Sequence, residues 1–120
     1  MYRIVIILAV VLSSGILHAK DQDASKVESI KLGEKVFKTT CFACHGPNGK
    51  GLVPGTPDLT GSKSPLKQDS AVLKKRIIEG YQSAGSPLAM PPKGGNPQLT
   101  EAEVDAVIVY MKNTFLPKSK

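Results

Sequence analysis

Apolar residues recur at helical spacing near the end of the chain. The stripe consists of Val104, Val107, Ile108, Met111 and Phe115. Intervals of three and four residues predict an amphipathic helix with one buried face. Thr100-Glu101-Ala102-Glu103 just before it is a capping box, and Leu99 can pack on Val104 as a hydrophobic staple. Pro117 marks the expected end of this helix.

Two other segments are expected to be helical. Residues from about Ser25 to Thr39 carry apolar side chains at moderately regular helical spacing. Ala71 to Glu79 follows Asp69 or Ser70, either of which can cap a helix, and precedes Gly80, where a left-handed residue would end it. Glycine- and proline-rich loops, 46–61 and 83–98, separate the helical segments. No segment alternates with period two, so we expect an all-α protein with long loops.

Residues 1–19 have the features of a secretory signal peptide. Arg3 precedes an apolar run, Ile4 to Leu12, and cleavage is expected after Ala19. Leu17 is large for the position three before the cut, so an uncleaved anchor is the alternative. The apolar run is shorter than the roughly 20 residues that span a bilayer. We therefore expect an exported, periplasmic protein, attached to a membrane only if this segment is retained.

Both cysteines of the chain stand in one run, Cys41-Phe42-Ala43-Cys44-His45. Such a run predicts covalent attachment of haem c, because two thiols at this spacing can each add to a vinyl group on one haem edge. His45 would bind the iron and is the only histidine after residue 19. A zinc site, a redox-active cysteine pair and a small disulfide are the alternatives. There is only one cysteine pair with one imidazole, and no strand pattern surrounds it.

The second axial position of such an iron needs another ligand. Met111 lies on the apolar stripe, where a core role is expected. Met90 lies in a loop directly before Pro91-Pro92, and prolines restrict the backbone that carries its soft sulfur. We therefore predict Met90 as the ligand. If the position is vacant, the protein would be peroxidase-like or gas-binding, with Arg76 as the only arginine after residue 19.

Charge adds little about partners. The chain has 16 Lys and Arg against 10 Asp and Glu, a formal net charge of +6. The lysines are scattered without interleaved aromatic residues, so nucleic-acid binding is not expected. They form either an ordinary solvated surface or, at Lys50, Lys63 and Lys93, a docking site for an acidic redox partner.

From about Val27 to Leu116 the chain resembles the class I c-type cytochromes. The haem run and the stretch Met90-Pro91-Pro92-Lys93-Gly94-Gly95-Asn96 carry the resemblance, the second to the small bacterial subgroup that includes cytochrome c-555. Gly33 and Phe37 stand where the family keeps a glycine and an aromatic residue on its first helix. Tyr110 stands where the last helix carries an aromatic residue. In the family these residues make a close helix crossing.

The resemblance implies the cytochrome c fold over residues 20–120, with three to four helices and long loops around one covalently bound haem. It also implies that the Pro57 carbonyl accepts a hydrogen bond from the Nδ1–H group of His45 and that Leu59 packs on the haem. The expected function is one-electron Fe(III)/Fe(II) transfer between redox proteins by a monomeric carrier with His/Met ligation, without catalysis. A haem subunit of a larger oxidoreductase has the same sequence features.

Overall fold

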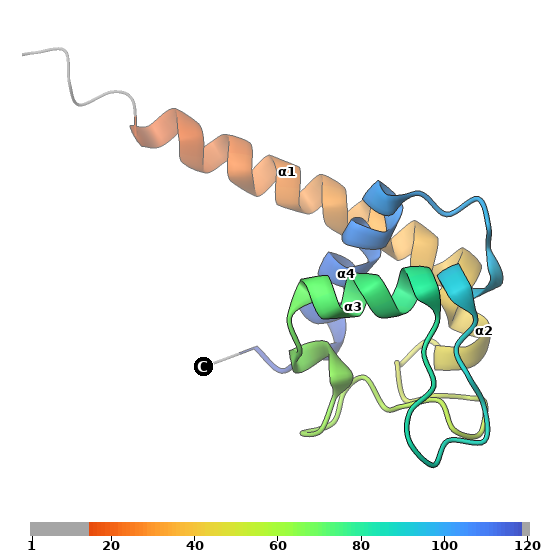
Figure 1. Cartoon of the computed structure of the whole chain (residues 1–120). Coiled ribbons are helices and arrows are strands. Elements are labelled where there is room, and N and C mark those ends of the chain that lie inside the picture. The colour runs from red at the N-terminus through yellow and green to blue at the C-terminus, as the bar shows by residue number, and fades with distance from the viewer. Residues whose placement is uncertain (1–14, 119–120) are drawn as a thin grey trace, which may run out of the picture.

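The computed structural model describes residues 15–118, with side chains from Lys20 onward. Its helices are α1 (Gly15–Val36), α2 (Phe42–His45), α3 (Ser70–Glu79) and α4 (Glu101–Phe115), shown in Figure 1. Three short turns are η1 (Phe37–Cys41), η2 (Pro65–Lys67) and η3 (Pro92–Gly95). Within this range there is no strand, only one isolated bridge. The predicted all-α class is therefore confirmed.

Helix α1 begins earlier than expected. It is one helix of 22 residues that starts at Gly15 rather than near Ser25, and its first half extends away from the other helices (Figure 1). Side chains from Lys20 to Glu28 are exposed, so this part has no apolar stripe by which periodicity could have predicted it. Within residues 15–118 no helix is both long and apolar enough to span a bilayer.

The predicted signal peptide lies largely outside the described residues, which begin at Gly15. Helix α1 is continuous through Ala19, the residue after which cleavage is expected. Cleavage therefore stays a prediction.

The first helix also ends differently from the prediction. Instead of stopping at Thr39, the chain passes through a π-helical turn, η1, into α2. The hydroxyl of Thr39 donates to the carbonyls of Lys35 at 3.0 Å and Val36 at 3.2 Å, which supports the wider turn. One additional residue in a turn rotates the side chains that follow by about 100° around the helix axis. Such turns are frequent at functional sites, and this one leads directly into the haem run.

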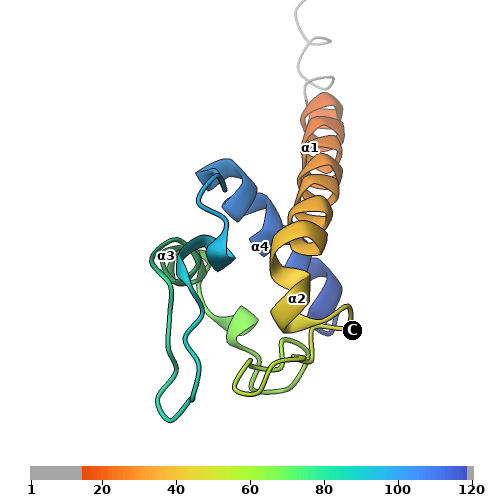
Figure 2. The ribbon, with the colours of Figure 1, turned by 90° about the vertical axis from the view of Figure 1, so that its right-hand side faces the viewer.

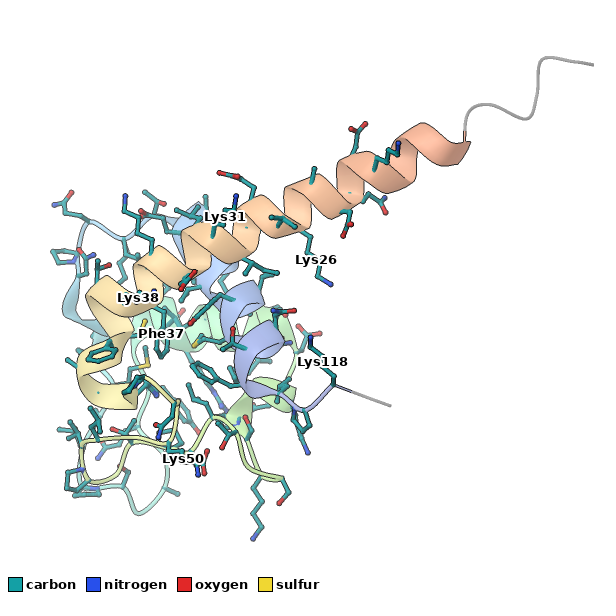
Figure 3. All side chains as sticks on the ribbon, turned by 180° about the vertical axis from the view of Figure 1, so that it is seen from behind. Lys26, Lys31, Phe37, Lys38, Lys50 and Lys118 are labelled. Carbon is teal, nitrogen blue, oxygen red and sulfur yellow. The ribbon has the colours of Figure 1, made fainter. Side chains whose placement is uncertain are left out.

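Helices α1 and α4 touch at Gly33. A Cβ on this glycine would lie 2.1 Å from the carbonyl oxygen of Ala106 and 2.6 Å from Cβ of Tyr110. One helical turn later, the Phe37 ring packs 5.6 Å from Tyr110 and 5.3 Å from Phe115, measured between ring centroids. Figure 3 shows Phe37 on the side of α1 that faces α4. The expected close crossing of the first and last helices is confirmed.

Local capping signals correctly predicted where α3 and α4 begin. Asp69 caps α3 by accepting from the amide of Ala71 at 2.7 Å. Thr100 and Glu103 form the predicted capping box of α4. At the other end of α3, Gly80 has φ 81° and ψ 164°. This combination of a positive φ with an extended ψ is available almost only to glycine. It differs from the expected left-handed helical conformation because Tyr81, the next residue, pairs with Met90.

The core gathers apolar side chains from α1, α3 and α4, from the short turns η1 and η2, and from the loops between them. Its buried members are Val36, Phe37, Leu59, Leu66, Leu73, Ile77, Leu99, Val104, Val107, Ile108, Met111 and Phe115. All five residues of the stripe predicted on α4 are among them. Buried Leu73 and Ile77 place α3 on the same core as α4. At the surface, the Lys74 ammonium also forms ion pairs with Asp105 at 2.8 Å and Glu101 at 3.2 Å.

Candidate functional site

A cavity of about 500 Å³ is lined by residues of both α2 and α3. Figure 2 shows the ribbons of these two helices on opposite sides of the molecule's lower half. Its apolar wall consists of Pro57, Leu59, Pro65, Leu66, Leu73, Ile77, Met90 and Met111. Cys41 and His45 line one side of it, and Arg76 and Tyr81 line another. Volumes of this size suit a cofactor or other small molecule, and a mostly apolar wall with few polar groups is typical of such sites.

Cys41 and Cys44 are both free thiols but differ in their surroundings. Cys41 lines the cavity, and burial, with a smaller contribution from Cys44, raises the pKa of the Cys41 thiol to about 11. Cys44 is exposed. A redox-active cysteine pair normally lies in surroundings that lower a thiol pKa. Burial of Cys41 raises its pKa instead, which disfavours the redox-pair alternative.

His45 brings an imidazole into the cavity. Burial lowers the pKa of His45, which favours the neutral form that binds metals. Its Nδ1 is buried and has no hydrogen-bond partner among the described residues. Pro57 and Leu59 line the same cavity, but no hydrogen bond joins Pro57 to the ring. The hydrogen bond from Nδ1–H of His45 to the Pro57 carbonyl therefore stays a prediction.

Met90 lies in the loop between α3 and η3 and lines the same cavity. Its backbone pairs with Tyr81 in an isolated antiparallel bridge: the Tyr81 amide donates to the Met90 carbonyl at 3.0 Å, and the Met90 amide donates to the Tyr81 carbonyl at 2.8 Å. A Cβ on Gly80 would lie 2.8 Å from the Met90 carbonyl oxygen and 3.0 Å from the Pro92 nitrogen. Glycine at position 80 thus lets the Met90 segment lie against the end of α3.

The structure places three further residues at the cavity in ways the sequence did not show. Met111 is a core residue, as predicted, but it also lines the cavity. Arg76 lies on the cavity wall with its guanidinium carbon 3.9 Å from the centroid of the Tyr81 ring, in a cation–π contact. Tyr81 was missed because a bridge of one residue pair leaves no periodic signal; only its position after Gly80 hinted at a turn.

These residues fit a covalently attached haem. The cavity offers a thiol and an imidazole from consecutive helical turns, apolar walls for a flat macrocycle, and a thioether from a separate loop. Histidine and methionine are the axial pair of c-type electron carriers.

Comparison with known proteins gives a consistent result. The family model for cytochrome c matches residues 30–115. Cytochrome c-555 of Prosthecochloris aestuarii is 35% identical over 86 residues, covering 70% of this chain and 86% of that protein. The cytochrome c lupanine 17-hydroxylase of a Pseudomonas species is 39% identical over 80 residues, covering 66% of this chain.

A third relative is the CcoP subunit of the cbb3-type cytochrome c oxidase of Rhodobacter capsulatus, 32% identical over 97 residues and 80% of this chain. The matched region is 10% of the hydroxylase and 32% of CcoP, so this chain corresponds to a part of these two relatives. No solved structure matches the chain.

Proposed function

Because this chain belongs to the cytochrome c family, we propose that it is a periplasmic single-haem electron carrier with His45 and Met90 as the axial ligands of the iron. Membership of the family implies covalently bound haem c and a role in electron transfer. The observation that carries the ligand assignment is that Cys41 and His45, on consecutive helical turns, and Met90, from a separate loop, line one cavity.

When bound, the haem would supply a one-electron Fe(III)/Fe(II) couple. Cys41 and Cys44 would hold the haem edge. Burial lowers the pKa of His45, which favours the neutral form that can bind iron. A Met90 thioether would favour the softer ferrous iron and raise the potential. The apolar residues of the cavity wall would disfavour the additional charge of the ferric state and so act in the same direction.

Met90 also decides between a carrier and an enzyme. Its backbone is fixed by two hydrogen bonds to Tyr81, and a ligand fixed in this way leaves no open position for oxygen or peroxide. Cytochrome c-555, most of whose length this chain covers, supports the carrier. A peroxidase-like or gas-binding protein is the second candidate, favoured by Arg76 on the cavity wall. However, the guanidinium of Arg76 is stacked on the Tyr81 ring. It therefore already has a contact partner within the protein, which weakens the case for this second candidate.

Replacing each cavity methionine separately tests the ligand assignment. In ferric protein, Met90→Ala should abolish the weak near-infrared sulfur-to-iron band and permit fast cyanide binding. The potential should fall by a sizeable part of the roughly 0.8 V that axial ligands can span. Met111→Leu is the matched control because Met111 lines the same cavity. As a near volume-conserving change it should cost less than about 1.5 kcal/mol of stability and leave the band intact.

The opposite pattern, with the band lost in Met111→Leu and kept in Met90→Ala, would make Met111 the ligand. If neither substitution changes the spectrum or potential, the sixth position is open and the peroxidase-like function replaces the carrier.

We further propose that lysines near the cavity guide an acidic redox partner. Lys63 lines the cavity, whereas Lys26 lies on the extended part of α1; Figure 3 shows Lys26 far along α1 and Lys50 on the loop after α2. Lys63→Ala should slow association with an acidic partner, and the rate should fall as salt shortens the Debye length below about 10 Å. Lys26→Ala, the matched control, should leave the rate unchanged. Rates independent of salt would make these lysines ordinary surface residues.

Export and assembly state can be measured directly. The mature protein should begin at Lys20 and behave as a monomer in the periplasmic fraction. Intact mass spectrometry and size-exclusion chromatography report both. A chain that still carries Met1 in the membrane fraction would instead be anchored, and co-elution with an oxidase would make it a subunit.

A further inference from the structure

Asn96 is a junction between three segments. Its carbonyl accepts from the Leu99 amide at 3.1 Å, and its Oδ1 accepts from the Gln98 amide at 3.1 Å, which leads the chain into α4. Its own amide donates to the Lys93 carbonyl at 3.1 Å and closes η3. Its side-chain Nδ2 donates to Oγ1 of Thr40 at 3.4 Å. This last contact is the one that leaves the loop.

Thr40 belongs to the haem-attachment segment. It lies in the π-helical turn directly before Cys41 and is half-buried. Its methyl group also faces η3: a Cβ built on Gly94 would lie 3.1 Å from Cγ2 of Thr40. Thr40 therefore contacts Gly94 of η3 with its methyl group and Asn96, the residue after η3, with its hydroxyl. The turn η3 begins at Pro92, two residues after Met90.

The segment between Met90 and Asn96 is fixed at its two ends and strained between them. The bridge to Tyr81 holds the Met90 end. Lys93 has φ 54°, and among the described residues it is the only one other than glycine with a positive φ. Such a conformation is uncommon and persists only where neighbouring contacts enforce it. Besides the bridge to Tyr81, η3 packs against α3 and η1, and the hydrogen bond from Asn96 to Thr40 ties the end of the segment to the haem-attachment segment. Losing this hydrogen bond would allow the strained segment to relax at that end.

We propose that the contact between Asn96 and Thr40 is a latch that keeps Met90 on the iron, so that these two polar side chains set how readily an external ligand can displace the methionine. The inference rests on the proposed ligation by Met90. Asn96 and Thr40 act through Met90 and are positioning residues.

Thr40→Val tests the latch because it removes the hydroxyl and nearly keeps the shape. In ferric holoprotein the substitution should raise the rate of cyanide binding by about two- to thirteen-fold, the range that corresponds to the loss of one hydrogen bond. The near-infrared band should remain at equilibrium. Thr40→Ser, which retains the hydroxyl, should restore a rate near that of the wild type.

Thr39→Val is the matched control. It is the same substitution one residue earlier in the π-helical turn, where the hydroxyl bonds only to carbonyls of α1. It should lower stability without changing the cyanide rate. An equal acceleration in Thr39→Val and Thr40→Val would show general loosening of the turn and overturn the latch.

A double variant separates the latch from the ligand assignment. Thr40→Val combined with Met90→Ala should bind cyanide at the rate of Met90→Ala alone, because the latch acts only through Met90. Further acceleration in the double variant overturns the latch but not the ligation. Wild-type spectrum and cyanide rate in Met90→Ala overturn the ligation itself, and the latch with it.

Discussion

Gly33→Ala should destabilise the protein, although alanine is the better helix former. On an exposed helix surface the substitution would stabilise by roughly 0.5–1 kcal/mol. In this fold the new methyl group would point into the backbone of α4. Its Cβ would lie 2.1 Å from the Ala106 carbonyl oxygen and 2.7 Å from the carbonyl carbon. The sign of the effect therefore tests the helix crossing.

The magnitude follows from which atoms must move. Both contacts at Ala106 are backbone atoms within a helix, so no side-chain rotation relieves the overlap, and α1 must shift away from α4 by on the order of 1 Å. Overpacking of this kind typically costs about 1–3 kcal/mol. After subtraction of the gain in helix propensity, we expect a net loss of about 1 kcal/mol. For a domain of this size that corresponds to a decrease in Tm of roughly 4–8 °C.

The assay is thermal and denaturant unfolding of ferric holoprotein, followed by far-ultraviolet circular dichroism. Gly61→Ala is the control, because a Cβ there would meet only Asp58 side-chain atoms, at 3.7 Å and beyond, and the backbone is not in the left-handed region. It should change Tm by little. If Gly33→Ala raises Tm or leaves it unchanged, the two helices do not make the crossing described, and the reasoning fails.

Three other outcomes are expected. The Cys41→Ser/Cys44→Ser double variant should accumulate as unfolded apoprotein, because the haem completes a small core; a colourless double variant with native helicity in circular dichroism would contradict this. Gly80→Ala places a Cβ 2.8 Å from the Met90 carbonyl oxygen at φ 81°, so it should cost more than about 1 kcal/mol and weaken the near-infrared band. Hydrogen bonds from the capping residue before α4 lower the pKa of Glu103 from its usual 4.5. Its stabilisation is therefore present above that pH and lost as pH falls through the lowered pKa. Glu103→Gln should remove this part of the acid dependence in urea midpoints measured from about pH 3 to 6.

Features set by neighbouring residues were predictable. The capping box at Thr100 and Glu103 and the cap at Asp69 depend on hydrogen bonds within three residues, so the sequence contains all of their partners. The buried stripe of α4 follows from helical periodicity alone. The haem run is equally local, since the attachment chemistry needs only two thiols and an imidazole at fixed spacing.

Contacts between distant segments were decided only by the tertiary structure. The pairing of Tyr81 with Met90 is an isolated bridge of one residue pair, which is too short to leave a periodic pattern in the sequence. The early start of α1 could not be predicted from an apolar stripe, since the described side chains from Lys20 to Glu28 are exposed.

The sequence by itself identified the residues that we propose carry the chemistry; what surrounds them was determined by packing. Cys41, Cys44, His45 and Met90 were identifiable from local motifs, and Gly33 from the resemblance. That Met111 also lines the cavity depends on how α4 lies against α2 and α3. That Gly33 is intolerant of a methyl group depends on the approach of Ala106. Local hydrogen bonds and periodicity are encoded within a few residues, whereas the distance between two helices is set by all the side chains packed between them.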